Sequence, residues 1–185
     1  MDELRTALGT TATGPRGPQP SRPGLLVLAA LLVSLVACGR APAPLSNTFD
    51  SDEALARAVL DAVAQKDGDR LAGLALTKDE FEAVVWPTLP VSRPEVRMPM
   101  DYVWQDTFTK SRLYLAQTLE EFGGRRYSLV RVEFQGDTTD HESYSVSRKT
   151  RLVVTDASGA EQTIRVFGSI IRQAGRSKVY SYIVD

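Results

Sequence analysis

The chain has 185 residues, with 22 basic and 23 acidic side chains and a formal net charge of −1. This near-neutral balance argues against a nucleic-acid-binding protein, because neutralising phosphates requires clustered lysines and arginines. One histidine and one cysteine supply neither the ligands of a zinc site nor a disulfide pair, so we expect no metal, no cofactor and no nucleic-acid partner.

The longest uncharged apolar stretch is LLVLAALLVSLVAC, residues 25–38. It is too short to cross a hydrocarbon core, which takes about 20 apolar residues. It has the length of the apolar region of a secretory signal, and Arg16 and Arg22 supply the basic region that precedes it. The pattern therefore predicts a signal peptide over residues 1–37.

The end of this stretch, Leu35-Val36-Ala37-Cys38, resembles the lipobox of bacterial lipoproteins. The resemblance implies cleavage between Ala37 and Cys38, a thioether-linked diacylglycerol on Cys38, and acylation of the new amino terminus, for example by palmitate. Several acyl chains give durable anchoring, whereas a single chain binds a membrane only marginally. The alternatives are an ordinary signal peptide with a chance cysteine, or a buried apolar helix. Either would leave the only cysteine of the chain as an unpaired thiol.

The lipobox resemblance also implies an address in the cell envelope. Gram-negative lipoproteins with a glycine after the cysteine, as Gly39 is here, are sorted to the outer membrane. We therefore expect a protein held to a membrane by the lipid on Cys38, on the periplasmic face of the outer membrane if the host is Gram-negative. Residues 38–49 contain GRAPAPLSN and predict a flexible tether about 30 Å long. A single domain is expected over residues 50–185.

Three helices are predicted at the start of this domain. The first covers residues 50–65 and can be capped by Asp50 or Ser51; its apolar stripe consists of Leu55, Val59, Leu60 and Val63. A short helix over residues 70–76 follows. Thr77-Lys78-Asp79-Glu80 has the pattern of a capping box and predicts a third helix, whose apolar face carries Phe81, Val84 and Val85.

Residues 86–100 contain prolines at positions 87, 90, 94 and 99, which predict that no regular element forms there. A loop of this length is either functional or draped over the core. We interpret it as a strap pinned by Trp86 and Leu89. Arg93 and Arg97, its only basic residues, are candidates for contacts with a ligand or partner.

After a last helix over residues 101–122, ended by Gly123-Gly124, the apolar period changes to the alternation of strands. Four strands are predicted, over residues 125–135, 143–155, 162–172 and 178–184. Short loops with turn residues join them as hairpins. Helices followed by hairpins predict an α+β domain, in which N-terminal helices pack on a curved four-stranded antiparallel sheet.

This order of elements resembles the NTF2-like or cystatin-like cone, in which a curved sheet wraps a long helix. The resemblance rests on the turn Lys66-Asp67-Gly68-Asp69, the short helix after it, the segment Thr77-Lys78-Asp79-Glu80-Phe81, and the strands that follow. It departs where the Pro-rich loop and the helix over residues 101–122 replace the usual strand or hairpin. Because the same cone serves enzymes and binding proteins, the resemblance implies a fold and no particular activity.

The sequence offers few catalytic candidates. Cone enzymes typically use an Asp with a Tyr or His in the cavity, yet the only histidine, His141, lies between Asp140 and Glu142 in a polar turn. A solvated turn is where a histidine without a catalytic role is expected. There is no Gly-x-Ser-x-Gly elbow and no Gly-rich phosphate loop. We therefore assign no catalytic residue.

One irregularity lies on the second predicted strand. The face that carries Tyr144, Val146, Leu152 and Val154 continues through Arg148 and Thr150. Tyr144 and Arg148 could line a cavity that binds an anionic group, but we favour a β-bulge or an exposed strand end as the explanation. Tyr180 and Tyr182 also share one face, for which we expect packing or, as an alternative, a homodimer contact through the sheet.

We therefore expect a non-catalytic domain that binds a partner protein or a small apolar ligand. The first alternative is a cone enzyme with isomerase or hydrolase-like activity that uses an Asp or Tyr in the cavity. A pocket of several hundred Å³ with a buried carboxylate beside a tyrosine would favour it. The second alternative is an envelope assembly factor, which predicts that copurifying partners are lost when Arg93 and Arg97 become Ala.

Overall fold

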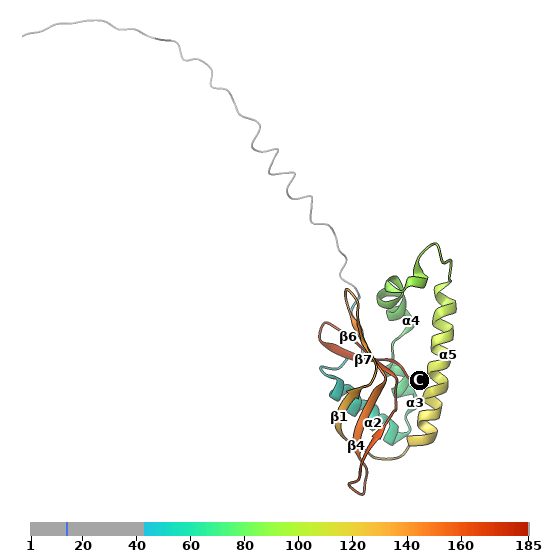
Figure 1. Cartoon of the computed structure of the whole chain (residues 1–185), viewed down its shortest axis with the longest axis vertical. Coiled ribbons are helices and arrows are strands. Elements are labelled where there is room, and N and C mark those ends of the chain that lie inside the picture. Colours follow the sequence, from blue (N-terminus) through green and yellow to red (C-terminus); the bar gives the residue numbers. More distant parts are fainter. Residues whose placement is uncertain (1–13, 15–42, 185) are drawn as a thin grey trace, which may run out of the picture. The chain divides into compact units, whose positions relative to one another are not determined.

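The computed structural model describes residue 14 and residues 43–184 (Figure 1). The predicted signal peptide, the lipobox with Ala37 and Cys38, and Gly39 lie outside the described residues, so lipidation and the envelope address stay predictions. Among the described residues, no helix is both long enough and apolar enough to span a membrane.

Two consecutive helices open the domain. α2 (Asp52–Gln65) begins where the Ser51 Oγ accepts a hydrogen bond from the Ala54 N–H at 3.1 Å, so one of the two predicted caps is confirmed. Lys66 ends α2 in the left-handed region, at a φ of 56°. α3 (Gly68–Leu74) is capped by the Asp67 carboxylate. The turn Lys66-Asp67-Gly68-Asp69 therefore already contains the start of α3, two residues before the predicted start at position 70.

The predicted capping box is confirmed in α4 (Lys78–Glu80). The Thr77 Oγ1 accepts a hydrogen bond from the Glu80 N–H at 3.3 Å, and the Glu80 carboxylate accepts one from the Thr77 N–H at 2.9 Å. The chain then widens into a π-helical turn, η1 (Phe81–Val85). The buried side of η1 carries the three apolar residues predicted for this face.

The first half of the Pro-rich segment is more regular than predicted. It forms two 3₁₀ turns, η2 (Trp86–Thr88) and η3 (Pro90–Ser92). Proline is compatible with the first positions of such a turn, because the amide it lacks would have no partner there. The expectation that no regular element forms is therefore wrong for this half. Trp86 and Leu89 pack against the core, as expected for a strap.

α5 (Met100–Phe122) is the long helix predicted over residues 101–122. It ends at Gly123, whose N–H still donates to the Leu119 carbonyl at 3.0 Å, and Gly124 is left-handed with a φ of 84°. Within α5, only Thr118 and Phe122 are buried. The helix therefore lies along the surface of the domain (Figure 1).

Within residues 43–184, seven strands form two antiparallel sheets, where the sequence predicts one sheet of four strands. The first sheet has the order β1-β4-β5, with β1 (Ser128–Phe134), β4 (Thr150–Thr155) and β5 (Glu161–Ile164). The second has the order β2-β3-β6-β7, with β2 (Thr138–Asp140), β3 (Ser145–Arg148), β6 (Ser169–Gln173) and β7 (Arg176–Ser181). The α+β class is confirmed, and the single four-stranded sheet is not.

Two of the predicted strands bend sharply and continue in the other sheet. The predicted strand 143–155 breaks at Lys149, which is left-handed with a φ of 54°, and becomes β3 and β4. The predicted strand 162–172 breaks before Gly168, where a Cβ atom would lie 1.7 Å from the Ile183 carbonyl oxygen. The Thr150 N–H donates to the Gly168 carbonyl at 2.9 Å, so the two breaks are neighbours. We call this line of bending, marked by Lys149, Thr150 and Gly168, the crease.

A second irregularity lies in β1. The sequence predicts Val130 on the apolar face, together with Val132 and Phe134. The register with β4 shifts between Leu129 and Arg131, and Val130 is 45% exposed. Such a bulge inserts one extra residue into the alternation, so Val132 and Phe134 after it still pack against the core. Leu129 packs against the core in place of Val130.

Two apolar clusters form the core. The larger packs α2 and α3 against both sheets and includes Leu55, Val59, Leu71, Leu152, Ile164, Phe167 and Ile170. The smaller lies beneath η1 and includes Leu45, Phe81, Val84, Val85, Tyr144, Val146 and Ile171. The neighbours Ile170 and Ile171 belong to different clusters because successive strand residues point to opposite faces. β6 is therefore covered on both faces.

The segment before α2 belongs to the folded domain, although the sequence predicts a tether that extends to residue 49. Leu45 is buried in the smaller cluster. Phe49 and Ser177 exchange two backbone hydrogen bonds, of 2.9 and 2.8 Å. Both Leu45 and Phe49 are apolar, and burying them outweighs the cost of ordering the chain around them. The range free to act as a tether therefore ends before Leu45.

Ion pairs fasten the β6–β7 hairpin to this segment, to the start of α2 and to α4. The pairs are Arg172–Asp52, Arg176–Asp50 and Lys178–Glu80. In the last of these, the fully buried Lys178 Nζ lies 2.9 Å from the Glu80 carboxylate and also donates to the Ser46 carbonyl at 2.8 Å. The hairpin therefore fixes the N-terminal segment through charge as well as through backbone pairing.

Candidate functional site

An apolar groove runs between α3 and α5, which lie side by side in Figure 1. α3 offers small residues at this contact, including Gly68 and Ala72, whereas α5 offers Phe108 and Leu115. The helices approach closely at one end, because a Cβ atom on Gly68 would lie 3.3 Å from the Leu119 Cδ1. We call this hollow the α3–α5 groove.

The inner end of the groove is a narrow space of about 50 Å³. Tyr180 of β7 and Tyr182, which follows β7, line it together with Trp104 and Ser111 of α5. The Tyr182 N–H donates to the Ser111 Oγ at 3.0 Å, and its hydroxyl donates to the Leu71 carbonyl at 2.7 Å. Tyr182 is therefore fixed to both helices that border the groove.

The outer part of the groove measures about 350 Å³ and opens to solvent. Ala72, Phe108, Arg112 and Leu115 line both parts, so the two spaces form one continuous hollow. Asp69 of α3 and Arg112 of α5 bring opposite charges to its lining. The groove thus combines an apolar floor with a polar rim, an arrangement that interfaces commonly use.

Phe108 stands at the mouth of the groove and is 43% exposed. Its ring stacks on Trp104 with 5.5 Å between the ring centroids, and the Arg112 guanidinium carbon lies 5.7 Å from the Phe108 centroid. Trp104 packs in turn on Phe81 of the smaller cluster, at 5.4 Å. Phe108 is therefore held in place while exposed, which lowers the entropic cost of using it in binding.

Tyr180 lines the inner end of the groove, and its hydroxyl makes no hydrogen bond with the described residues. Burial raises the pKa of Tyr180 to about 12; the neighbouring Tyr144 adds to the rise, and the Arg148 charge opposes it. The hydroxyl therefore keeps its proton at neutral pH.

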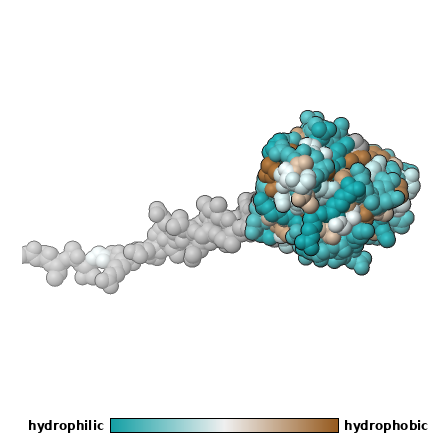
Figure 2. All heavy atoms as spheres, turned by 90° about the horizontal axis from the view of Figure 1, so that it is seen from below, coloured by the Kyte–Doolittle hydropathy of each residue, from teal (hydrophilic) through white to brown (hydrophobic). Residues whose placement is uncertain are grey.

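Other hollows lie at the end of the domain shown in Figure 2, where hydrophilic residues predominate. They measure about 520 and 580 Å³ and lie around Arg126, Tyr127 and Asp156. The Asp156 carboxylate accepts hydrogen bonds from the Ser158 hydroxyl and N–H, at 2.6 and 2.8 Å, which lower its pKa. Its Oδ1 also accepts from the Ala160 N–H at 3.1 Å and so serves its own turn, and we assign no site there.

Arg93 and Arg97, the predicted contact residues of the Pro-rich segment, lie in the exposed loop between η3 and α5. Neither side chain makes an ion pair or hydrogen bond with the described residues. They are not among the residues that line the α3–α5 groove. The structure therefore keeps them as surface candidates that are separate from the groove.

Tyr144 and Arg148, the other predicted contact residues, do not line a common cavity with Thr150. Tyr144 is buried, its hydroxyl lies 2.6 Å from the Thr88 Oγ1, and its ring stacks on His141 at 4.4 Å. Arg148 is exposed at the end of β3, and the break at Lys149 turns Thr150 into the interior. The exposed strand end explains the irregular pattern.

The sequence did not predict the α3–α5 groove. Leu115 and Leu119 have the spacing of a core-facing stripe, although both are only partly buried. The signal that could have indicated the groove is the set of small residues, Gly68, Ala72 and Ala75, in and just after a short helix near an aromatic-rich one. Among the described residues, no group of His, Cys, Asp and Glu side chains could hold a metal ion.

No family model matches the chain, and neither does any curated protein or solved structure. The groove and its aromatic lining are therefore the basis on which a function can be argued.

Proposed function

We propose that this is a lipid-anchored protein of the cell envelope whose domain binds a partner protein through the α3–α5 groove. The anchor is supported by the lipobox pattern of residues 35–38. The binding role is carried by one observation: Phe108 stays exposed at the mouth of an apolar groove while Trp104 and Arg112 hold its ring. Exposed apolar surface with a polar rim is typical of interaction sites.

The open shape of the groove and its narrow inner end favour a protein segment over a small ligand. Small-molecule pockets commonly measure about 300–1,000 Å³ and enclose most of the ligand. Here the inner space is only about 50 Å³, and the larger part is open. The inner end suits one apolar side chain of a partner. The α5 residues from Trp104 to Leu119 extend about 22 Å at 1.5 Å per residue, enough for a short helix or extended segment alongside.

The anchor can be tested with Cys38→Ser in the full chain. We expect this variant to remain uncleaved and unlipidated, because the hydroxyl of serine does not form the thioether. The measurement is the apparent mass together with the incorporation of labelled fatty acid. If Cys38→Ser matches the unchanged chain in size, in lipid label and in membrane retention, the anchoring half of the proposal is wrong.

The groove can be tested by replacing Phe108 with a photo-crosslinking amino acid in cells that make the full chain. Val130 is the matched control, because it is 45% exposed, close to the 43% of Phe108, but lies on β1. We expect a discrete crosslinked protein from position 108 and none from position 130. Equal crosslinking at both positions, no crosslink at 108, or a crosslink only to a second copy of this chain would contradict the proposal.

We also propose that the fold belongs to the NTF2-like or cystatin-like class. Strands that continue from one sheet into the other and pack around α2 support this assignment. An enzyme of this class with an Asp or Tyr in its cavity is the alternative. Two facts weigh against it: the inner end of the groove has no carboxylate among its lining residues, and the buried Glu80 is paired with Lys178.

A further inference from the structure

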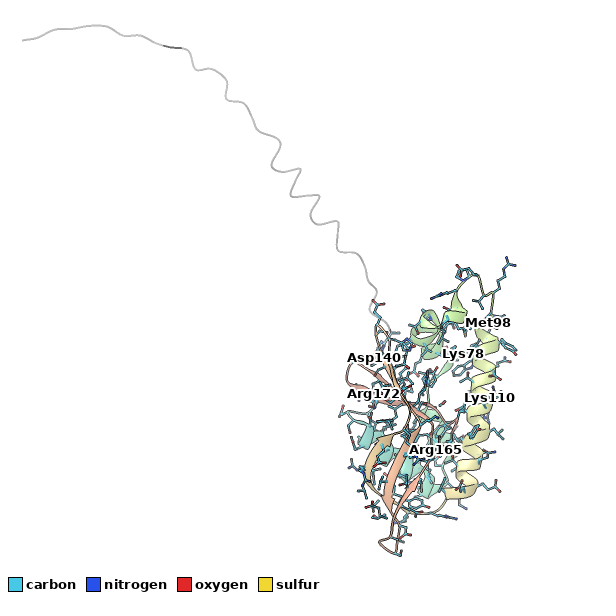
Figure 3. All side chains as sticks on the ribbon, viewed as in Figure 1. Lys78, Met98, Lys110, Asp140, Arg165 and Arg172 are labelled. Carbon is cyan, nitrogen blue, oxygen red and sulfur yellow. The ribbon has the colours of Figure 1, made fainter. Side chains whose placement is uncertain are left out.

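Apolar side chains gather at one end of the domain without being buried. Six large hydrophobic side chains are exposed in the described domain, and Val96 (47%), Met98 (37%) and Tyr102 (66%) are three of them. All three lie in the loop that leads to α5 or in the first turn of α5. We call residues 93–102 the tip. Figure 1 shows this loop projecting beyond the ends of α4 and α5, and Figure 3 labels Met98 there.

The tip also carries basic groups that the domain does not use. The guanidinium groups of Arg93 and Arg97 make no ion pair or hydrogen bond with the described residues. Arg97 adopts a left-handed φ of 53°, which a residue other than glycine rarely takes. Two acidic residues also lie in the tip: Glu95, between the two arginines, and Asp101, whose carboxylate pairs with Lys78. Exposed apolar side chains beside free guanidinium groups match the chemistry of a membrane interface, where apolar groups enter the headgroup region and cations meet phosphates.

The number of residues between Cys38 and the described domain limits how far this end of the domain can lie from a lipid on Cys38. The first described residues lie beside the β6–β7 hairpin and η1: the Ala43 carbonyl accepts a hydrogen bond from the Gln173 Nε2 at 3.4 Å, and Leu45 packs with Phe81. In Figure 1 the coloured ribbon begins at the same end of the domain as the tip. From Cys38 to Ala43 is five residues (43 − 38), which reach about 18 Å at most. A lipid on Cys38 would therefore hold this end, and not the opposite one, near the bilayer.

The remaining charges at this end favour contact through the tip. Asp140 and Glu142 are exposed on the β2–β3 hairpin. Figure 3 shows Asp140 and Met98 on opposite sides of this end. Lipid phosphates would repel the acidic hairpin and attract Arg93 and Arg97, which would tilt the domain so that the tip meets the membrane. The opposite end of the domain is predominantly hydrophilic (Figure 2).

We propose that the tip is a second membrane contact, in which Val96, Met98 and Tyr102 enter the headgroup region and Arg93 and Arg97 bind lipid phosphates. This inference rests on the lipid anchor of the proposed function. A lipid chain alone leaves a domain free to rotate about its attachment point. Two contacts fix which side of the domain faces the membrane, and so fix the direction in which the α3–α5 groove is presented.

The experiment uses the full lipidated chain in vesicles of phosphatidylethanolamine and phosphatidylglycerol. Because Cys38 is the only cysteine and its sulfur would be a thioether, Met98→Cys introduces one reactive thiol for an environment-sensitive fluorophore. Ala157→Cys, exposed in the β4–β5 turn, is the control at the other end. We expect a blue-shifted emission at position 98, quenched by lipids with nitroxides high on the acyl chain, and neither effect at position 157.

Flotation of the same samples separates the two claims. Protein that floats with the vesicles without quenching at position 98 overturns the membrane contact and leaves the anchor standing. Protein that does not float overturns the anchor and the inference with it. A label at 98 that is protected only after another protein is added would assign the tip to a protein partner, which also overturns the inference.

The phosphate contacts are tested by charge reversal. In a chain labelled at position 98 that also carries Arg93→Glu and Arg97→Glu, we expect most of the quenching to be lost. Unchanged quenching would contradict the phosphate contacts.

Discussion

The β6–β7 hairpin and α5 use their side chains in opposite ways. In the hairpin, Arg172, Arg176 and Lys178 each pair with a carboxylate elsewhere in the domain, and Lys178 is fully buried. In α5, by contrast, Tyr102 is 66% exposed and Leu113 is 58% exposed. The three basic residues of the hairpin are all paired, Lys178 in the interior and Arg176 at the surface, whereas α5 leaves part of its apolar surface in contact with water.

The difference separates residues that maintain the fold from residues available for binding. A buried charge that loses its partner is costly, so the position of Lys178 tolerates little change. An exposed apolar side chain contributes little to folding, and it is available for contacts with another molecule. Substitutions in the hairpin should therefore lower stability, and substitutions on α5 should lower binding and leave stability nearly unchanged.

The largest effect is expected from Lys178→Met. The change keeps the apolar stem of the side chain but leaves the Glu80 carboxylate buried without its counter-charge. We expect a loss of about 3–5 kcal/mol in the free energy of unfolding, measured by urea denaturation. Lys78→Met is the control, because the Lys78–Asp101 pair is exposed on both sides and exposed ion pairs contribute little to stability. If both variants lost the same free energy of unfolding, the buried pair of the hairpin would be no more important for stability than the exposed pair at α5.

Acidification should weaken the same pair. Burial by itself raises the pKa of Glu80, but hydrogen bonds from the Thr77 and Ser46 backbone and from Lys178 outweigh it and lower the pKa from 4.5 to about 2. Because the pKa of Glu80 is lower in the folded state than in the unfolded state, its carboxylate stabilises the fold at pH values above about 4.5. This contribution is lost as the pH falls from about 4.5 toward 2. We expect the free energy of unfolding to fall by on the order of 3 kcal/mol across this range. Urea denaturation at a series of pH values measures this loss. The Glu80→Gln variant should be less stable at neutral pH and should lack this part of the pH dependence.

Tyr182→Phe tests the residue that joins the core to the groove. The change removes the hydroxyl and leaves the buried Leu71 carbonyl without its 2.7 Å hydrogen bond. We expect the free energy of unfolding to fall by about 1–2 kcal/mol. The measurement is the shift in the midpoint of urea denaturation. Tyr180→Phe is the control, since the Tyr180 hydroxyl makes no hydrogen bond with the described residues. A larger loss for Tyr180→Phe than for Tyr182→Phe would reverse this assignment.

The smallest effect on stability is expected from Leu113→Ser on the outer side of α5. Because Leu113 is 58% exposed, the free energy of unfolding should change by no more than about 0.5 kcal/mol. Thermal denaturation provides the measurement. A loss comparable to that of Tyr182→Phe would mean that α5 contributes to the fold through its outer surface, and the comparison between the two regions would fail.

Local signals in the sequence predicted the helices well and the sheets only in part. Ser51 and Thr77 reveal helix starts because a cap involves neighbouring residues only. The crease is different. Lys149 is left-handed and Gly168 meets the Ile183 carbonyl because of contacts between distant segments. The alternation of apolar and polar residues continues across such a break. The sequence therefore predicts one continuous strand at each of the two places where the structure has two strands.

The candidate site was less predictable than the fold. The capping role of Glu80 was evident from the sequence, whereas its pairing with Lys178, 98 residues away, was not. The α3–α5 groove depends on how two helices lie against each other, and no local pattern fixes that. Arg93 and Arg97 were predicted as candidates because their loop has too many prolines for a regular element, and the structure places them on the surface.

At the crease, the backbone changes direction in two neighbouring strands, next to the 2.9 Å hydrogen bond between Thr150 and Gly168. The β2–β3 hairpin and η1 lie beyond this line and rely on the smaller cluster, whereas β4 and β5 rely on the larger one. Opening of one part therefore need not spread to the other, and amide hydrogens in β3 should exchange with solvent faster than those in β4. We therefore expect the end that rests on the smaller cluster, from which the chain leads back toward Cys38, to open more readily than the end that rests on the larger cluster.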